Sequence, residues 1–412
     1  MKTFEELYKD LLARKISLDE PLPEGYDPSH LDCLVHPEKY APVLQVKECE
    51  KCAYDRACKN SCVFDAIREG EDGKLWIDPE LCVGCEACIK ACKDERLAAS
   101  RDVLPAMKAV REAKGAVYMM IAPAFLGQFS EEVTPGKLRT AFKALGFTGM
   151  VEVALFADIL TLKEALEFDA HIQQEGDFQL TSCCCPVWIA MIRKTFHELM
   201  PHVPGAVSPM VACGRMVKKI HPGAVTVFAG PCLAKKKEAR EEDIKDAVDY
   251  VLTFQEVKDI FEAADIHPEE LAEAAKEHAS KAGRLYARTG GVSRAVAEMV
   301  AQLRPDRSIA VRARHANGTK ECMKMIKDIK EGNTEANFYE GMGCVGGCVG
   351  GPKAILDVEE GTKNVDQYAE NSAFQTPLEN PYVLKLLEEL GLETVEELLE
   401  DTLLTRDFRE GV

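Results

Sequence analysis

The stretch LCVGCEACIKAC, residues 81–92, carries four cysteines in a C-x2-C-x2-C-x3-C spacing: Cys82, Cys85, Cys88 and Cys92. Three close thiols followed by a fourth are typical of a segment that holds a [4Fe–4S] cluster. The run therefore predicts a small domain built around a cluster.

A second group of four cysteines precedes the first, with three residues inserted in the same pattern: Cys49, Cys52, Cys58 and Cys62. Two such groups resemble the halves of a bacterial ferredoxin, in which each fourth cysteine ligates the other cluster. Exchanging the fourth ligands assigns one cluster to Cys49, Cys52, Cys58 and Cys92, and the other to Cys82, Cys85, Cys88 and Cys62. The alternative is a pair of four-cysteine zinc sites. The small residues Gly84, Ala87 and Ala91 favour clusters, because they let backbone amides approach sulfur.

Composition bounds the class of protein. A chain of 412 residues is long enough for two to three domains. Its 51 basic and 69 acidic residues give a net charge of −18, which argues against nucleic acid or an anionic membrane as partner. The seventeen cysteines, without a signal-like N-terminus, favour reduced thiols and metal ligation over disulfides. The expected location is the cytoplasm.

The change in composition along the chain predicts three parts: an N-terminal lead over 1–45, a cluster domain over 46–100 and a larger body over 108–412. In the body, strand-like runs such as AVYMMIAPAF, AVTVFAG and SIAVRARH alternate with charged amphipathic stretches such as ILTLKEALEFDAHIQQ. This alternation predicts helices covering mainly parallel sheets.

The body carries three further cysteine stretches: TSCCCPVW (181–188), GPCLAKKKEA (230–239) and EGMGCVGGCVGG (340–351). Cys232 follows a predicted strand end, where ligand sites of α/β folds gather. Cys344 and Cys348 would share one face if the segment is helical. Lys235 either places its ammonium beside an anionic group or is a solvated member of the KKK run.

In order and separation, these three stretches resemble the H-cluster signatures of [FeFe]-hydrogenases. The resemblance implies an α+β ferredoxin-like cluster domain followed by a two-lobed α/β H-cluster domain with mainly parallel sheets. It implies reversible H2 oxidation and proton reduction, with electrons exchanged with ferredoxin or a similar carrier. The implied cofactors are two [4Fe–4S] clusters and the H-cluster, a [4Fe–4S] cluster bridged to a diiron subsite with CO, cyanide and azadithiolate, which maturation proteins would supply.

The resemblance also implies roles for single residues. The cubane ligands would be Cys185, Cys232, Cys344 and Cys348, with Cys348 as the bridge. Lys235 would hydrogen-bond a cyanide, and the residues lining the diiron site would be Met342, Ala122 and Pro123. Glu164 and Glu167 lie where the family has its proton route, although glutamates on surface helices are common.

The first signature has one cysteine more than usual. Aligning on Cys-Cys-Pro makes Cys184 the proton relay and Cys185 the ligand, whereas the other register makes Cys183 the relay and Cys184 the ligand. A thiol suits a relay because its pKa, near roughly 8.5, is close to working pH. A TSCCCP signature also resembles hydrogenases in which a mobile loop lets the relay thiol protect the site from oxygen. Gly230 is a departure, since a methionine is usual at this position.

Two other functions compete with a hydrogenase. A low-turnover H2-sensing protein would agree with side-chain contacts missing near the diiron site. An iron–sulfur assembly factor of the hydrogenase-like kind has related cysteines without a diiron subsite, but Lys235 and the complete EGMGCVGGCVGG stretch disfavour it.

Overall fold

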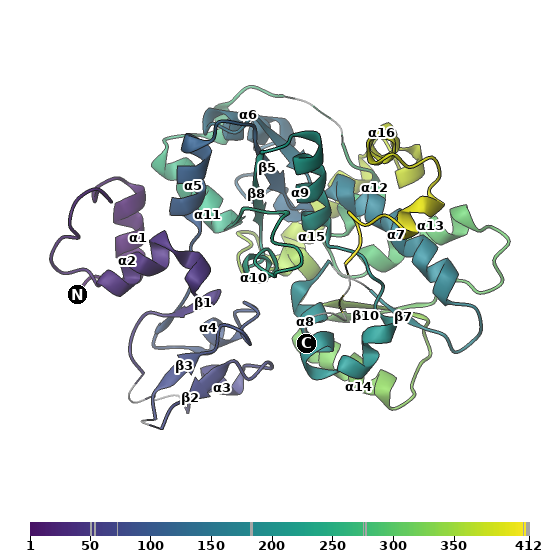
Figure 1. Ribbon diagram of the computed structural model, residues 1–412, viewed down its shortest axis with the longest axis horizontal. Coiled ribbons are helices and arrows are strands. Elements are labelled where there is room, and N and C mark those ends of the chain that lie inside the picture. The colour runs from purple at the N-terminus through teal and green to yellow at the C-terminus, as the bar shows by residue number, and fades with distance from the viewer. Residues whose placement is uncertain are drawn as a thin grey trace.

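The computed structural model describes residues 1–49, 52, 55–71, 73–181, 184–274, 276, 278–406 and 408. A helical lead comes first, with α1 (Phe4–Leu12) packed on α2 (Pro28–Val35) before the short turn η1 (Pro37–Lys39). Thr3 and Glu6 form a reciprocal capping box that satisfies backbone N–H groups at the start of α1. This lead projects at the left of Figure 1.

A small α+β module follows and lies below the lead in Figure 1. Its elements are β1 (Val43–Gln45), α3 (Ala57–Asn60), β2 (Ile67–Glu69), β3 (Leu75–Ile77), α4 (Ala87–Ala91) and β4 (Leu97–Ala99). β1 pairs with β4 and β2 with β3, both antiparallel, and α3 contacts α4. The strand pairing that closes the module therefore begins at Val43.

The first lobe of the body is built on a parallel sheet of order β6-β5-β8-β9. Its strands are β5 (Val117–Ile121), β6 (Gly149–Glu152), β8 (Val225–Gly230) and β9 (Tyr250–Thr253). Its helices are α5 (Val103–Glu112), α6 (Pro135–Ala144), α9 (Pro209–Ile220), α10 (Ala234–Glu238) and α11 (Phe254–Ala263). The central strands β5 and β8 are mostly buried, as expected for a sheet covered by helices.

The second lobe has a parallel sheet of order β10-β11-β7. Its strands are β7 (Gln179–Leu180), β10 (Ala313–Asn317) and β11 (Phe338–Met342). Its helices are α8 (Pro186–Thr195), α12 (Lys281–Leu285), α13 (Gly291–Leu303) and α14 (Thr319–Lys330). The carboxyl ends of β8 and β11 each lead directly into a cysteine stretch, which positions the site.

Helix α7 (Ala154–His171) runs through the interior and contacts α9, α12, α13 and the C-terminal tail. Its first fifteen residues are all buried. The alternative that Glu164 and Glu167 are ordinary glutamates of a surface helix therefore fails, because the polar residues of the stretch ILTLKEALEF lie inside the protein. They are buried because α7 is covered on several sides rather than on one.

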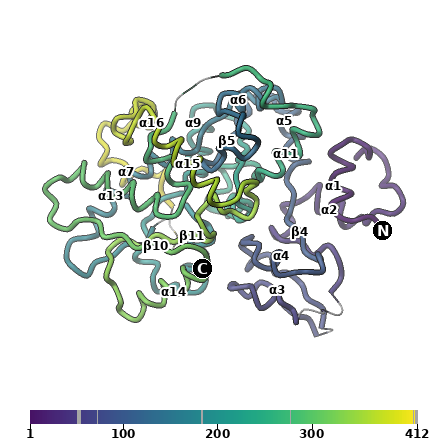
Figure 2. The backbone as a smooth tube through the Cα atoms, turned by 180° about the vertical axis from the view of Figure 1, so that it is seen from behind, coloured from purple at the N-terminus to yellow at the C-terminus, as the bar shows by residue number. Residues whose placement is uncertain are grey.

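The tail wraps back over the body through α15 (Val358–Glu370), α16 (Pro381–Leu390) and η7 (Glu396–Leu399), and Thr405 forms a bridge with Ala206. The remaining short turns are η2 (Pro123–Phe125), η3 (His197–His202), η4 (Pro268–Glu270), η5 (Gly347–Gly350) and η6 (Pro377–Glu379). Figure 2 shows the molecule from behind, with α15 and α16 of the tail on the body and the small module beside it. Lys194 of α8 donates to the Glu80 carbonyl of the module, so the second lobe contacts the module.

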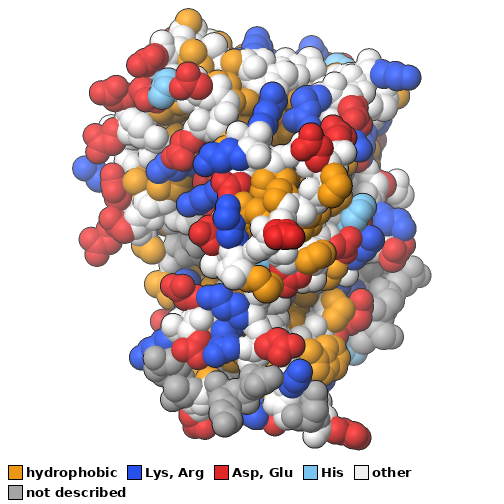
Figure 3. Space-filling model, turned by 90° about the vertical axis from the view of Figure 1, so that its left-hand side faces the viewer, with side chains coloured by type: hydrophobic (Ala, Val, Ile, Leu, Met, Phe, Trp, Pro, Cys, Tyr) orange, Lys and Arg blue, Asp and Glu red, His pale blue; other side chains and the backbone are white. Residues whose placement is uncertain are grey.

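The mixed α/β body with parallel sheets confirms the predicted fold class. One predicted strand is displaced, since SIAVRARH starts at 308 but β10 begins at Ala313. Among the described residues, no helix has both the length and the apolar character to cross a membrane. Figure 3 shows acidic and basic side chains interspersed on the face with the lead and the module, so the charge of −18 is not concentrated there.

Candidate metal and redox site

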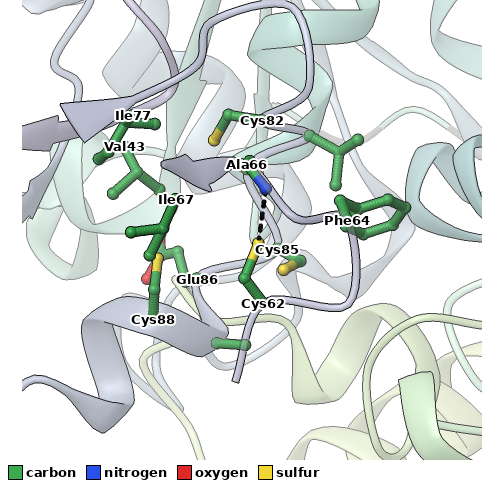
Figure 4. Close-up of a pocket in the computed structure, with 13 residues that line it drawn as sticks. Val43, Cys62, Phe64, Ala66, Ile67, Ile77, Cys82, Cys85, Glu86 and Cys88 are labelled. Carbon is green, nitrogen blue, oxygen red and sulfur yellow. Dashed lines mark hydrogen bonds between the residues drawn. The ribbon is translucent and has the colours of Figure 1, made fainter. Parts of the chain in front are cut away.

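The module brings one set of four thiols around a single cavity, here called the inner set: Cys62, Cys82, Cys85 and Cys88. Figure 4 shows these side chains around a common space, together with Glu86 and apolar residues such as Val43 and Ile67. The Ala66 N–H donates to Cys62 Sγ at 3.3 Å. Burial raises the pKa of the Cys82 thiol, while backbone N–H groups of Gly84 and Val43 lower it. Backbone N–H groups thus approach the sulfur atoms of Cys62 and Cys82, as expected from the small residues in this segment.

The other four thiols of the module, the outer set, line a second cavity: Cys49, Cys52, Cys58 and Cys92. Lys93, Asp94 and Arg96 also line it, and Cys52 is exposed. Each set thus combines three cysteines of one group with the fourth of the other. This exchange arises because α3 and α4, which end beside the fourth cysteines, lie against each other.

Both thiol sets fit clusters in their chemistry. Within the described part of the chain, no three His, Cys, Asp or Glu side chains meet closely enough to hold one metal ion. The thiols surround a space instead. Burial and, to a smaller extent, the neighbouring thiols raise the pKa of Cys88 and of Cys85, that of Cys85 to about 11. Four thiolates at such a site require a positively charged group between them.

A third set of four thiols, the body set, meets where the two lobes adjoin: Cys185, Cys232, Cys344 and Cys348. Cys185 precedes α8, Cys232 follows β8, and the other two follow β11. The Gly343 N–H donates to Cys185 Sγ at 3.3 Å. Burial, together with the nearby Cys185 thiol, raises the pKa of Cys232 and of Cys348 to about 12 each. The set therefore also fits a multi-iron group.

Cys344 and Cys348 do not share an α-helix, contrary to the helical expectation. Cys344 precedes a turn in which Gly346 and Gly347 have φ of +87° and +83°, and Cys348 lies in η5. A Cβ on Gly347 would meet the Thr289 backbone N at 2.7 Å. Left-handed backbone and close packing thus fix the loop, and both favour glycine.

Each lysine of the KKK run has its own surroundings. Burial lowers the pKa of Lys235, but its ion pair with Glu238 at 2.7 Å and, to a smaller extent, the Cys232 and Cys184 thiols raise it overall. Lys236 is buried too, with its Nζ 3.1 Å from Asp102 and 2.9 Å from Glu256. Lys235 is therefore not a solvated lysine, and its positive charge lowers the pKa of Cys348.

Three residues with implied lining roles lie at or just after the ends of two strands, one in each lobe. Ala122 follows β5, and its N–H donates to Ala229 O at 2.8 Å. Pro123 opens η2, and Met342, which is buried, ends β11. A Cβ on Gly230 would meet the Phe228 ring at 2.8 Å and the Ala122 Cβ at 3.1 Å. The space that the absent methionine would enter is thus taken by Phe228.

Glu164 and Glu167 are buried on α7, 3% and 6% exposed, so they are not surface glutamates. Burial and the nearby Glu164 raise the pKa of Glu167 while Lys163 lowers it, and the net result is a pKa of about 8. Lys163 lies one turn before Glu167 and was not singled out from the sequence, although an i,i+4 Lys–Glu spacing was visible.

Cys184 is partly buried beside Lys235. Cys183 lies outside the described residues.

Comparison with known families agrees with this geometry. Residues 115–352, more than half of the chain, match the model of the iron only hydrogenase large subunit, C-terminal domain. Residues 75–95 match a 4Fe-4S binding domain. The chain belongs to the iron-only hydrogenase large-subunit family, which confirms the resemblance to [FeFe]-hydrogenases and the presence of iron–sulfur and H-cluster binding features.

Individual relatives differ in how much they share. Iron hydrogenase 1 of Clostridium pasteurianum is 29% identical over 269 residues, covering 54% of this chain and 46% of the relative. The NADP-reducing hydrogenase subunit HndD of Solidesulfovibrio fructosivorans is 23% identical, covering 92% and 76%. The cytosolic Fe-S cluster assembly factor NAR1 of Yarrowia lipolytica is 29% identical, covering 33% and 31%. The chain thus spans less than half of the first relative.

Solved structures show the same fold. An apo [FeFe]-hydrogenase HydA1 from Chlamydomonas reinhardtii superposes with a TM-score of 0.61 at 22% identity, covering 74% of this chain and 98% of that one. At this identity the match defines the architecture of the body and not the chemistry of its site.

Proposed function

We propose that the chain is an [FeFe]-hydrogenase that interconverts H2 with protons and electrons. The observation that carries the proposal is the body set, four partly buried thiols from three distant segments with the Lys235 ammonium beside them. The bound H-cluster would supply an open iron site and a nearby amine base for splitting H2. Cys185, Cys232, Cys344 and Cys348 would hold its cubane, with Cys348 as the bridge.

Other residues around this set would hold and shield the diiron part. Lys235 is buried and positively charged, which suits hydrogen bonding to an anionic cyanide in a water-poor site. Met342, Ala122 and Pro123 sit at the carboxyl ends of β11 and β5, and we assign them the lining of the site. Their apolar character would keep water from it.

Protons would travel between the site and solvent through Cys184, Glu164 and Glu167. A relay works best when its pKa is near the operating pH, and the pKa of Glu167, about 8, satisfies this. Its neighbour Lys163 contacts the tail at Leu398 O, 2.7 Å away, so this end of α7 borders the C-terminal segment.

Electrons would pass through the two module clusters to and from ferredoxin or a similar carrier. The outer set includes the exposed Cys52, which gives a carrier close access, whereas the inner set is more buried. Each cluster would carry one electron at a time.

An assembly factor is the second candidate, because relatives named as such align with part of the chain. A buried lysine beside four thiols favours the hydrogenase. Infrared spectra of protein expressed with diiron-site maturation separate the alternatives. CO and cyanide bands with H2 evolution support the hydrogenase, bands without turnover indicate a sensor, and no bands indicate the assembly factor.

A further inference from the structure

Glu86, which lies between two cysteines of the inner set, has an unusual backbone conformation. It lies between Cys85 and Ala87, precedes α4 and has φ of +61°. A non-glycine residue in this left-handed region costs free energy and persists only where its surroundings hold it. Its side chain makes no hydrogen bond to the start of α4. The cost is therefore not repaid by helix capping.

The Glu86 carboxylate is also buried, with only 3% of the residue exposed. It forms an ion pair at 3.1 Å with Lys353, whose side chain is 13% exposed. Its other oxygen, Oε1, has no hydrogen-bond partner among the described residues. Removing a carboxylate from water is expensive even when it is paired. Two separate costs thus fall on one residue.

The ion pair joins the module to the segment that follows Cys348 of the body set. Glu86 lines the same cavity as the four inner thiols, as Figure 4 shows. Lys353 follows the loop of Cys348, and its backbone N–H donates to Pro231 O at 3.0 Å, just before Cys232. A Cβ on Gly84 would meet the Ala234 Cα at 3.1 Å, so the backbones are in close contact here.

We propose that Glu86 is a positioning residue that sets the reduction potential of the inner cluster and, through Lys353, fixes that cluster against the loops of the body set. This rests on the proposed function only in assuming that electrons cross this contact. A fixed negative charge beside a cluster disfavours adding an electron, and low local dielectric strengthens the effect. Lys353 keeps that charge in place without occupying the cavity itself.

The chain offers a matched control in the other half of the module. Arg56 occupies the equivalent position before α3, with φ of +53°, and pairs with Glu69 within the module. Its side chain is 38% exposed. Arg56→Gly therefore relieves the same kind of backbone strain and removes a charge without touching the body.

The experiment is a redox titration followed by electron paramagnetic resonance on full-length protein carrying its iron–sulfur clusters. Signals are assigned with Cys58→Ser, which removes a ligand of the outer set only. In Glu86→Gln and Glu86→Gly, we expect the inner midpoint potential to become less negative while the outer one stays. Arg56→Gly should leave the inner midpoint unchanged.

The positioning role is tested by the rate of hydrogen–deuterium exchange of the backbone amides in residues 351–353. This rate should increase in Glu86→Gly. An unshifted inner midpoint in Glu86→Gln, or an equal shift of both clusters, would overturn the proposal. So would unchanged exchange in Glu86→Gly. The titration needs neither a diiron site nor H2 turnover, so failure of the proposed function would appear separately, as absent infrared bands.

Discussion

The Lys163 ammonium lies 3.8 Å from the Glu167 carboxylate, one turn along a helix that runs through the interior. Both side chains are less than one-tenth exposed. A buried lysine here opposes the effect of burial on the carboxyl group and so tunes the proposed proton route.

Replacing Lys163 by methionine should change the pH dependence of H2 evolution. Lys163 lowers the pKa of Glu167, so its loss should raise that pKa above the present value of about 8. If Glu167 passes protons in its protonated form, the alkaline decline of the rate then moves to higher pH. Lys163→Arg keeps the charge and should leave the decline in place. An unchanged profile in Lys163→Met would remove Glu167 from the route.

Exchange of the fourth ligands between the cysteine groups is testable by two serine variants. Cys92→Ser should abolish the cluster of the outer set, although Cys92 belongs to the run of Cys82. Cys62→Ser should abolish the inner cluster instead. Iron content and paramagnetic resonance distinguish the two losses. The assignment is wrong if each variant loses the cluster of its own group.

Packing at Gly230 predicts a stability effect near the proposed diiron site. Gly230→Ala would place a Cβ 2.8 Å from the Phe228 ring, and overpacking of this kind costs about 1 to 3 kcal/mol. Adding Phe228→Leu should recover part of the lost stability, because the stability effects of substitutions at two residues in contact do not simply add. Melting temperatures of both single variants and the double variant provide the test. Strict additivity would show that Phe228 does not occupy that space.

Protection by Cys184 is tested by exposure to air after oxidation. Cys184 lies beside Lys235 at the body set, so its thiol is close to where oxygen would react. Cys184→Ala should lose its CO and cyanide infrared bands faster than the parent. Equal rates of loss would exclude a protective role for this thiol.

Spacing predicted the two sets of the module, because cysteine ligands within one segment are fixed by local geometry. The four thiols of the body set followed instead from the resemblance to [FeFe]-hydrogenases, and the structure brings each of the three sets together. The parallel sheets also followed from alternating apolar and amphipathic runs.

Features that depend on tertiary packing could not be predicted. Residues of α7 look like a surface helix in sequence, and only the tail and neighbouring helices bury Glu164 and Glu167. Glu86 and Lys353 are 267 positions apart (353 − 86), so no local pattern joins them. The contact between Ala122 and Gly230 is of the same kind, because it exists only where β5 and β8 are paired. The Phe228 ring, by contrast, is a local neighbour of Gly230, two positions away on the same face of β8.

The central claim is that the body set holds an H-cluster that turns over H2. The most direct measurement combines infrared spectroscopy with H2 evolution from a reduced dye, on protein expressed with diiron-site maturation. We predict CO and cyanide bands together with H2 production, and loss of both in Cys348→Ser. Protein with intact module clusters but neither bands nor H2 would contradict the claim.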